Sequence, residues 1–201
     1  MRRPLRRLAG CVLVGAALAG CSSSSSKVST AATTTSVAPS TTTSVTSSPP
    51  TTAAPLVGGA VTPVSTPSQG HAKLTAVRVG DQGGFDRVTF EFTGGLPGYN
   101  VRYVSRPVQE DPTGKTIDVQ GDSVLGVRFE GASGVDLSGG KVTETYTGPK
   151  RLPSTTASVA ELVETGDFED VLNWAVGTHG HPAFKVSQDA AGLRIVIDIA
   201  H

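Results

Sequence analysis

The stretch Asp86-Arg87-Val88-Thr89-Phe90-Glu91-Phe92 alternates polar and apolar side chains. Successive side chains of a β-strand point to opposite faces, so the valine and the two phenylalanines share one face. Leu193-Arg194-Ile195-Val196-Ile197-Asp198-Ile199 repeats the pattern, with four aliphatic side chains on one face and Arg194 and Asp198 on the other. Each stretch therefore predicts a strand with one buried face and one outward face.

Between these two stretches, short β-branched or aromatic runs alternate with Gly, Pro, Asp and Asn, which is typical of strands and turns. The predicted strands span residues 74–79, 86–92, 99–104, 124–129, 159–164, 168–176, 183–187 and 193–199. Thr165-Gly166-Asp167 is typical of a hairpin turn, although the apolar residues between Val159 and Val176 also fit a helical stripe. We predict an all-β fold, an antiparallel β-sandwich of about eight strands.

The predicted sandwich occupies residues 73–201, enough for one hydrophobic core. From residue 22 to about residue 70 the chain is nearly all Ser, Thr, Ala, Pro, Val and Gly, with Lys27 as its only charge. Such a segment cannot bury enough apolar surface to become ordered, so residues 21–72 are expected to form a disordered tether. A flexible chain of about 50 residues spans roughly 40 Å. The composition also fits an O-glycosylated stalk, and a glycosylated and a bare linker both stay open.

The first 20 residues have the organisation of a secretion signal. Four arginines within the first seven residues precede an apolar run, Leu8 to Ala19, that is too short to span a bilayer. Leu18-Ala19-Gly20-Cys21 resembles the lipobox of bacterial lipoproteins, in which cleavage precedes the cysteine and a diacylglycerol is attached to its thiol. We therefore expect residues 1–20 to be removed and Cys21 to anchor the protein on the extracytoplasmic face of the cell membrane. An ordinary secreted protein with Cys21 as an unpaired thiol is the alternative.

Cysteine and charge content exclude several classes of function. The other cysteine, Cys11, lies in the predicted signal, so the mature chain would have no disulfide, cysteine-based zinc site or second thiol. The predicted domain contains all 17 acidic residues and 12 of the 17 basic residues, a net charge of −5. This acidic balance argues against a nucleic-acid partner.

The predicted domain also lacks a recognisable catalytic constellation. It has no Gly-x-Ser-x-Gly elbow, and adjacent acids such as Glu110-Asp111 and Glu169-Asp170 would point to opposite faces of a strand. His179 and His181 could share a metal ion but have no third ligand nearby. We therefore expect a protein that is not an enzyme, with no catalytic residue, metal site or cofactor.

Five stretches of the predicted domain resemble the AMIN-like domain of actinobacterial lipoproteins. They are Gly84 to Phe92, Pro97 to Val104, Tyr146-Thr147-Gly148-Pro149, Thr165-Gly166-Asp167-Phe168-Glu169 and Arg194 to Ile199. That domain is similar to the AMIN domain of cell-wall amidases and type IV pilus secretins, whose strands include a D-R-V-type opening and an R-hydrophobic-hydrophobic-D-hydrophobic close. The resemblance implies a β-sandwich that binds or localises to peptidoglycan or a wall-associated envelope protein. We expect no zinc-amidase domain to follow, because the sandwich extends to His201.

Three arginines, Arg87, Arg102 and Arg194, lie on the outward faces of predicted strands. A guanidinium binds a carboxylate through two parallel hydrogen bonds, so these residues could form a stripe that binds the peptide stems of peptidoglycan. The alternative is a solvated face with cross-strand ion pairs to acids such as Glu91 and Asp198.

The aromatic residues are expected in the core instead. Trp174 shares its strand parity with Leu172 and Val176, and Tyr99 and Tyr103 share one face of another strand, with their hydroxyls at the core's edge. As an alternative function, the sandwich could carry a lipid or another apolar ligand between its sheets.

Overall fold

The computed structural model describes residues 62–68 and 70–201. The predictions for the signal (residues 1–20) and for lipidation of Cys21 lie outside the described residues, as does most of the predicted linker. The described part of the chain forms β-strands and no helix. A helix suited to crossing a membrane is accordingly not found in this part of the chain.

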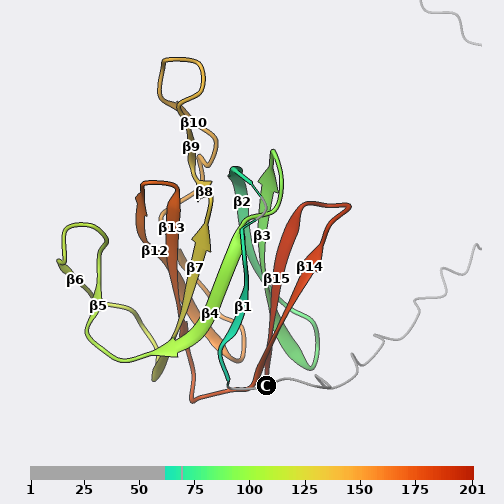
Figure 1. The fold of residues 1–201 in the computed structure, drawn as a ribbon. Helices are drawn as coiled ribbons and strands as arrows, with labels where there is room; N and C mark the ends of the chain where they lie inside the picture. The colour runs from blue at the N-terminus through green and yellow to red at the C-terminus, as the bar shows by residue number, and fades with distance from the viewer. Residues whose placement is uncertain (1–61, 69) are drawn as a thin grey trace, which may run out of the picture. The chain divides into compact units, whose positions relative to one another are not determined.

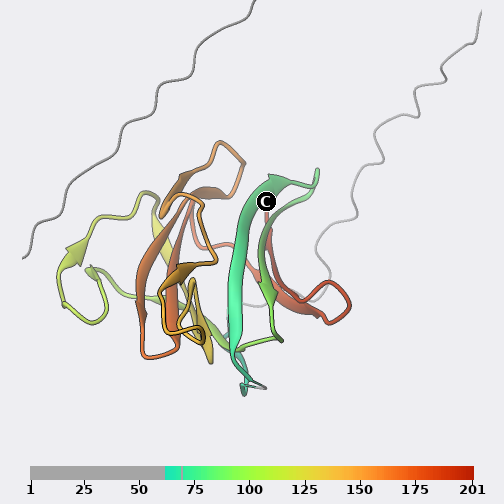
Figure 2. The same cartoon turned by 90° about the horizontal axis from the view of Figure 1, so that it is seen from above.

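Two sheets pack face to face, as Figures 1 and 2 show from two directions. The six-stranded sheet has the order β1 (Val64–Thr66), β4 (Gly98–Val104), β7 (Ser123–Glu130), β13 (Val171–Thr178), β12 (Val159–Phe168) and β11 (Arg151–Pro153). The five-stranded sheet has the order β14 (Phe184–Asp189), β15 (Arg194–Ala200), β3 (Phe85–Thr93), β2 (Ala72–Asp81) and β8 (Ala132–Ser133). Neighbouring strands are antiparallel except β2 and β8.

Two short ladders complete the fold. One pairs β5 (Val108–Gln109) with β6 (Thr116–Ile117), and the other pairs β9 (Val135–Asp136) with β10 (Thr143–Glu144). In Figure 1 the β5–β6 loop stands at the side of the six-stranded sheet, and the β9–β10 hairpin projects at the end away from the C-terminus.

The predicted all-β sandwich is confirmed, and its eight predicted strands correspond to β2, β3, β4, β7, β12, β13, β14 and β15. The remaining strands have two or three residues each, too short to show an alternating pattern in the sequence. β1 lies inside the segment predicted as linker, where it pairs with β4 and places Val64 opposite Val101. The helical alternative for Val159 to Val176 is wrong, since this region forms β12 and β13.

The turn predicted at Thr165-Gly166-Asp167 is also wrong. β12 continues to Phe168, with a bulge between Glu164 and Gly166, and the chain turns at the next two residues instead. Gly166 allows β12 and the segment around Asp111 to approach each other closely. A Cβ there would lie 2.5 Å from the carbonyl oxygen of Asp111, far inside van der Waals contact.

The space between the sheets is filled by aromatic and aliphatic side chains. Phe90 of the five-stranded sheet makes edge-on contacts with Phe129 and Trp174 of the six-stranded sheet, with ring centroids 4.9 and 5.9 Å apart. Trp174 is 1% exposed, which confirms its prediction as a core residue. Tyr99 is buried, and Tyr103 is half-buried with its hydroxyl donating to the carbonyl of Pro182 at 2.6 Å.

Candidate functional site

The segment between β4 and β7, residues 105–122, crosses the outer face of the six-stranded sheet and contains β5 and β6. We call this segment the strap. Figure 2 shows it in yellow-green outside the sheet, on the side away from the five-stranded sheet. A small apolar cluster, separate from the main core, packs the strap onto the sheet. Its buried members are Val108 and Val119 from the strap and Val124, Val163 and Ala175 from the sheet.

Hydrogen bonds fix the strap at the far end of its path. The carboxylate of Glu161, 3% exposed, accepts the backbone N–H of Gln120 at 2.6 Å. Both of its oxygens also accept from the Arg151 guanidinium, at 2.5 and 2.6 Å, and Arg151 donates in turn to the carbonyl of Asp118. A buried carboxylate must be paired in this way, so Glu161 ties the strap to β12 and β11.

A second anchor lies near the middle of the strap. The backbone N–H of Asp111 donates to the carbonyl of Thr165 at 2.7 Å. The side-chain amide of Asn173 donates to the Asp111 carboxylate at 3.0 Å. The anchor lies at the bulge in β12, where Asp111 occupies the space that Gly166 leaves open.

Between the strap and the sheet lies a groove of about 320 Å³. The strand register aligns two rows of lining residues across β4, β7 and β13. The rows are Asn100, Arg128 and Asn173, and Arg102, Gly126 and Ala175; Val104 of β4 lines the groove beside them. The groove therefore has a row of amide and guanidinium groups on one side, a floor of small residues, and an apolar side under the strap.

Arg102 is the free cation of this groove. Its side chain is exposed, and no carboxylate of residues 62–68 or 70–201 makes an ion pair with it. Arg128, in the adjacent row, lies 3.4 Å from Glu130. The groove can thus offer at least one guanidinium to an incoming anion without breaking an internal ion pair.

The outer face of the five-stranded sheet is arranged differently. The guanidinium of Arg87 donates to both oxygens of Asp198 at 2.6 and 2.8 Å. The hydrogen bond with Asp198 raises the pKa of Arg87 against the opposing effect of burial. Arg194 lies 3.3 Å from Glu91 and 3.5 Å from Asp189. The predicted cross-strand ion pairs are confirmed for Arg87 and Arg194.

The three predicted arginines do not form one stripe. Arg87 and Arg194 lie on β3 and β15 of the five-stranded sheet, whereas Arg102 lies on β4 of the six-stranded sheet. All three face outward, as strand parity predicts, but the two outer faces point in opposite directions. Parity identifies the face of a strand but not the sheet to which the strand belongs.

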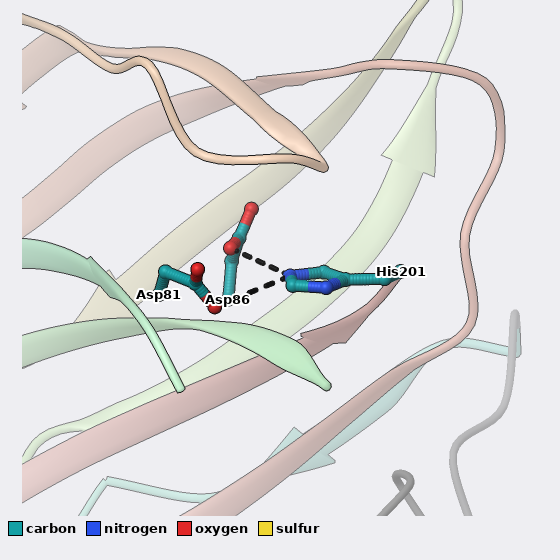
Figure 3. Close-up of side chains that lie close together, drawn as sticks. All are labelled: Asp81, Asp86 and His201. Carbon is teal, nitrogen blue, oxygen red and sulfur yellow. Dashed lines mark hydrogen bonds and ion pairs between the residues drawn. The ribbon is translucent and has the colours of Figure 1, made fainter. Parts of the chain in front are cut away.

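A second polar cluster, which sequence reasoning missed, lies where β2 and β3 meet the end of β15 (Figure 3). We call Asp81, Asp86 and His201 the clasp. The Nε2 atom of His201 lies 2.9 Å from Asp86 Oδ1 and 3.8 Å from Asp81 Oδ1. The other oxygen of the buried Asp86 carboxylate accepts the backbone N–H groups of Ser158 and Val159, at 2.7 and 2.9 Å.

The hydrogen bonds of the clasp define its chemistry. Burial raises the pKa of Asp86, but hydrogen bonds from Thr156, His201, Ser158 and Val159 outweigh burial, so the pKa lies below its usual value of 3.8. The three side chains place ligand atoms within 4.8 Å of one another, a spacing that a metal ion could use. Since both Asp86 oxygens already accept hydrogen bonds, the clasp acts as a tie between β3, the start of β12 and the end of β15.

Comparison with known proteins gives one match. The family model of the AMIN-like domain matches residues 72–201. The matched region begins at the first residue of β2 and includes the strap, the groove and the clasp. No curated protein and no solved structure matches the chain.

Proposed function

Because the chain belongs to the AMIN-like domain family, we propose that it is a non-catalytic lipoprotein of the cell envelope that binds peptidoglycan through the groove under the strap. In this proposal, residues 1–20 are removed and the lipid on Cys21 holds the protein on the extracytoplasmic face of the membrane. The tether then lets the domain reach the wall.

The groove is the observation that carries this proposal. Peptidoglycan presents carboxylates, amides and hydroxyls, and these groups pair with guanidinium and carboxamide side chains. The groove provides such side chains in Asn100, Arg102 and Arg128. On the other outer face, Arg87 and Arg194 are already bound to carboxylates of the same chain, so a ligand would have to displace those contacts.

A binding role rather than a catalytic one is supported by the acidic residues of the groove. Hydrolysis of a glycosidic bond ordinarily uses two carboxyl groups on opposite sides of the bond, roughly 5 to 9.5 Å apart. The described residues that line the groove include one carboxylate, that of Asp111, and Asn173 donates a hydrogen bond to it. Its neighbour Glu110 accepts a hydrogen bond from Thr113 within the strap.

The alternative prediction, a carrier of lipid or another apolar ligand, has no such support. Its ligand would lie between the sheets, where Phe90, Phe129 and Trp174 are buried and in contact. The groove is on the outer face, and much of its lining is polar.

The wall-binding proposal is tested by sedimentation of the protein with purified peptidoglycan sacculi. We expect wild type and Arg194→Ala to sediment equally and Arg102→Ala to stay largely in the supernatant. The two substitutions remove the same group from opposite outer faces, so Arg194→Ala controls for the loss of a positive charge. Equal sedimentation of both variants and wild type would contradict the role of the groove, and no sedimentation of wild type would contradict wall binding.

The anchoring part of the proposal is tested separately, by growing cells that express the protein with an alkyne-labelled fatty acid. Wild type is expected to take up the label and fractionate with membranes, whereas Cys21→Ser takes up none and leaves the membrane fraction. Label that persists in Cys21→Ser would place the lipid on another residue.

A further inference from the structure

The two sides of the groove differ in chemistry, and this difference restricts the ligand. On the polar side, Asn100 and Arg128 lie next to Arg102, whose guanidinium makes no ion pair among the described residues. A guanidinium presents two parallel N–H groups that match the two oxygens of a carboxylate. Carboxamides pair with the N–H and C=O groups of a peptide bond. This side therefore matches the end of a peptide chain that carries a free carboxylate.

The opposite side of the groove is apolar. Val104 from β4, Pro107 and Val108 from the strap, and Ala175 from β13 line it. Such a wall favours a methyl-sized or slightly larger aliphatic group over a charged one. A ligand that spans both sides would thus carry a small apolar side chain close to its carboxylate.

The floor of the groove depends on Gly126, which lies between Arg102 and Ala175 in the strand register. A Cβ at this position would lie 2.9 Å from Val104 Cγ1 and 3.5 Å from the carbonyl oxygen of Arg102. Glycine at this position therefore lets the Val104 side chain lie against the floor of the groove. A larger side chain at position 126 would collide with Val104 and displace it into the groove.

Size and lining favour a peptide over a sugar chain. The volume of about 320 Å³ lies at the lower end of the roughly 300–1,000 Å³ range of ligand pockets, so the ligand is short. Sugar rings pack on flat aromatic faces, but the one aromatic residue among the described lining residues is Trp174, whose ring is buried between the sheets.

From these features we infer that the groove binds the C-terminal end of a short peptide, with the free carboxylate on Arg102 and a small aliphatic side chain against the apolar wall of Val104, Pro107 and Val108. The inference rests on the proposed function, since the peptide stems of peptidoglycan are the source of such ends in the wall. It adds that the stems, and not the glycan strands, are recognised.

The inference is tested by calorimetric titration of the protein with acetyl-lysyl-D-alanyl-D-alanine and with the same peptide as its C-terminal amide. The acid is expected to bind at least tenfold more tightly than the amide, since only the acid can form the charge-assisted pair with Arg102. Arg102→Gln is expected to remove this preference, and Arg194→Gln is expected to keep it. Equal affinity for acid and amide would overturn the inference.

Substitution of the floor gives a second test that leaves Arg102 in place. Gly126→Val is expected to abolish peptide binding with an unchanged circular dichroism spectrum, and the smaller Gly126→Ala to weaken it severalfold. Gly126→Ala serves as the test if the valine variant does not fold. Full peptide affinity in a folded Gly126→Val protein would overturn the placement of the ligand.

Sacculi stripped of their stems by an amidase separate this inference from the proposed function. We expect the protein to sediment with intact sacculi but not with stripped glycan. Equal sedimentation with both would overturn stem recognition and leave wall binding in place. Peptide binding in solution without sedimentation on intact sacculi would overturn the wall-binding proposal.

Discussion

On the outer face of the five-stranded sheet, the Arg87 guanidinium is bonded to both carboxylate oxygens of Asp198. On the outer face of the six-stranded sheet, by contrast, Arg102 has no ion pair within the described part of the chain. The two faces also differ in cover. The strap hides an apolar patch on the six-stranded sheet, whereas the charged ladder of the five-stranded sheet faces solvent.

This difference indicates where binding energy is available. A ligand that binds the five-stranded sheet must break existing ion pairs before it can form its own, so the net gain in binding free energy is small. A ligand in the groove meets the Arg102 guanidinium, which makes no ion pair within residues 62–68 and 70–201. The same residue type thus has a structural role on one face and is free for recognition on the other.

The largest expected effect on stability comes from a valine-to-aspartate substitution, which is compared on the two outer faces. Val124→Asp would place a carboxylate in the buried cluster beneath the strap, at 1% exposure. We expect this variant to lose about 3 to 5 kcal/mol of unfolding free energy or to fail to fold. Val196→Asp places the same group on the five-stranded face, next to Arg87 and Arg194, and is expected to change the free energy by about 1 kcal/mol or less.

Urea unfolding followed by tryptophan fluorescence measures both variants, since Trp174 is the only tryptophan. Similar losses in Val124→Asp and Val196→Asp would show that the strap does not bury its apolar patch in solution. The comparison of a covered and an open face would then be wrong.

The next comparison concerns two glutamates, one on each face. Glu161 is almost fully buried and holds the strap through Gln120 and Arg151. Glu91 is partly exposed and lies between Arg78 and Arg194. Glu161→Ala leaves an orphaned N–H and guanidinium, so we expect a loss of about 2 to 4 kcal/mol. Glu91→Ala removes exposed pairs and is expected to cost about 1 kcal/mol or less.

Amide hydrogen exchange at Gln120 shows whether the strap itself is released. Exchange there is expected to accelerate in Glu161→Ala and to stay unchanged in Glu91→Ala. Unchanged exchange in Glu161→Ala would mean that the apolar cluster alone holds the strap.

Sequence patterns predicted the parts of this molecule that depend on local alternation. The eight long strands and the burial of Trp174 follow from a period of two residues, which a strand displays directly. The ion pairs of Arg87 and Arg194 could be predicted because Glu91 and Asp198 lie on the same outward strand faces as these arginines. Each of these features is visible within one or two short stretches.

The groove could not be predicted from the sequence, because local patterns do not contain the information that defines it. The strap has no alternation, so nothing marked Val108 and Val119 as buried. Arg102 could be assigned to a face but not to a sheet, because strand order is set by contacts between distant segments. Gly166 was interpreted as a turn residue, whereas it accommodates Asp111 from the strap. The clasp was missed for the same reason, since Asp86 and His201 are far apart in sequence.

A pH titration tests how the two sheets are held together. Asp86 lies on β3 of the five-stranded sheet. Its carboxylate accepts the backbone N–H groups of Ser158 and Val159 at the start of β12, in the six-stranded sheet. Its folded pKa is lowered, so its contribution to stability is present above the usual pKa of 3.8 and is lost as pH falls through the folded pKa. Wild type should therefore lose part of its stability advantage over Asp86→Asn below about pH 4.

Urea midpoints of wild type and Asp86→Asn, measured from about pH 7 down to about pH 2.5, give this difference directly. Other carboxylates titrate in both proteins and cancel in the comparison, including Asp136, whose pKa is lowered by hydrogen bonds from Ser138. A difference that stays constant across the whole range would contradict the assignment of Asp86 as an ionised tie between the sheets.

The smallest expected effect lies in the turn between β12 and β13, which belongs to the six-stranded sheet but lies outside the groove. Glu169 and Asp170 both have positive φ, 51° and 59°, a conformation that costs a residue such as glutamate about 1 kcal/mol and aspartate less. Glu169→Asn with Asp170→Gly relieves that strain, although glycine adds chain entropy to the unfolded state. The net expectation is a gain of about 0.5 to 1 kcal/mol, measured by urea unfolding.

The same variant separates stability from binding on one sheet. The backbone carbonyl of residue 170, which accepts from Ala132, is kept, and neither substituted side chain lines the groove. Sedimentation with sacculi should therefore match wild type, in contrast to Arg102→Ala, which should lose binding without loss of stability. The variant also removes two acidic side chains, including the Asp170 carboxylate that lies 3.2 Å from His71. A turn variant that is more stable but no longer binds would show that the recognition surface extends beyond the groove to these side chains at the end of the sandwich.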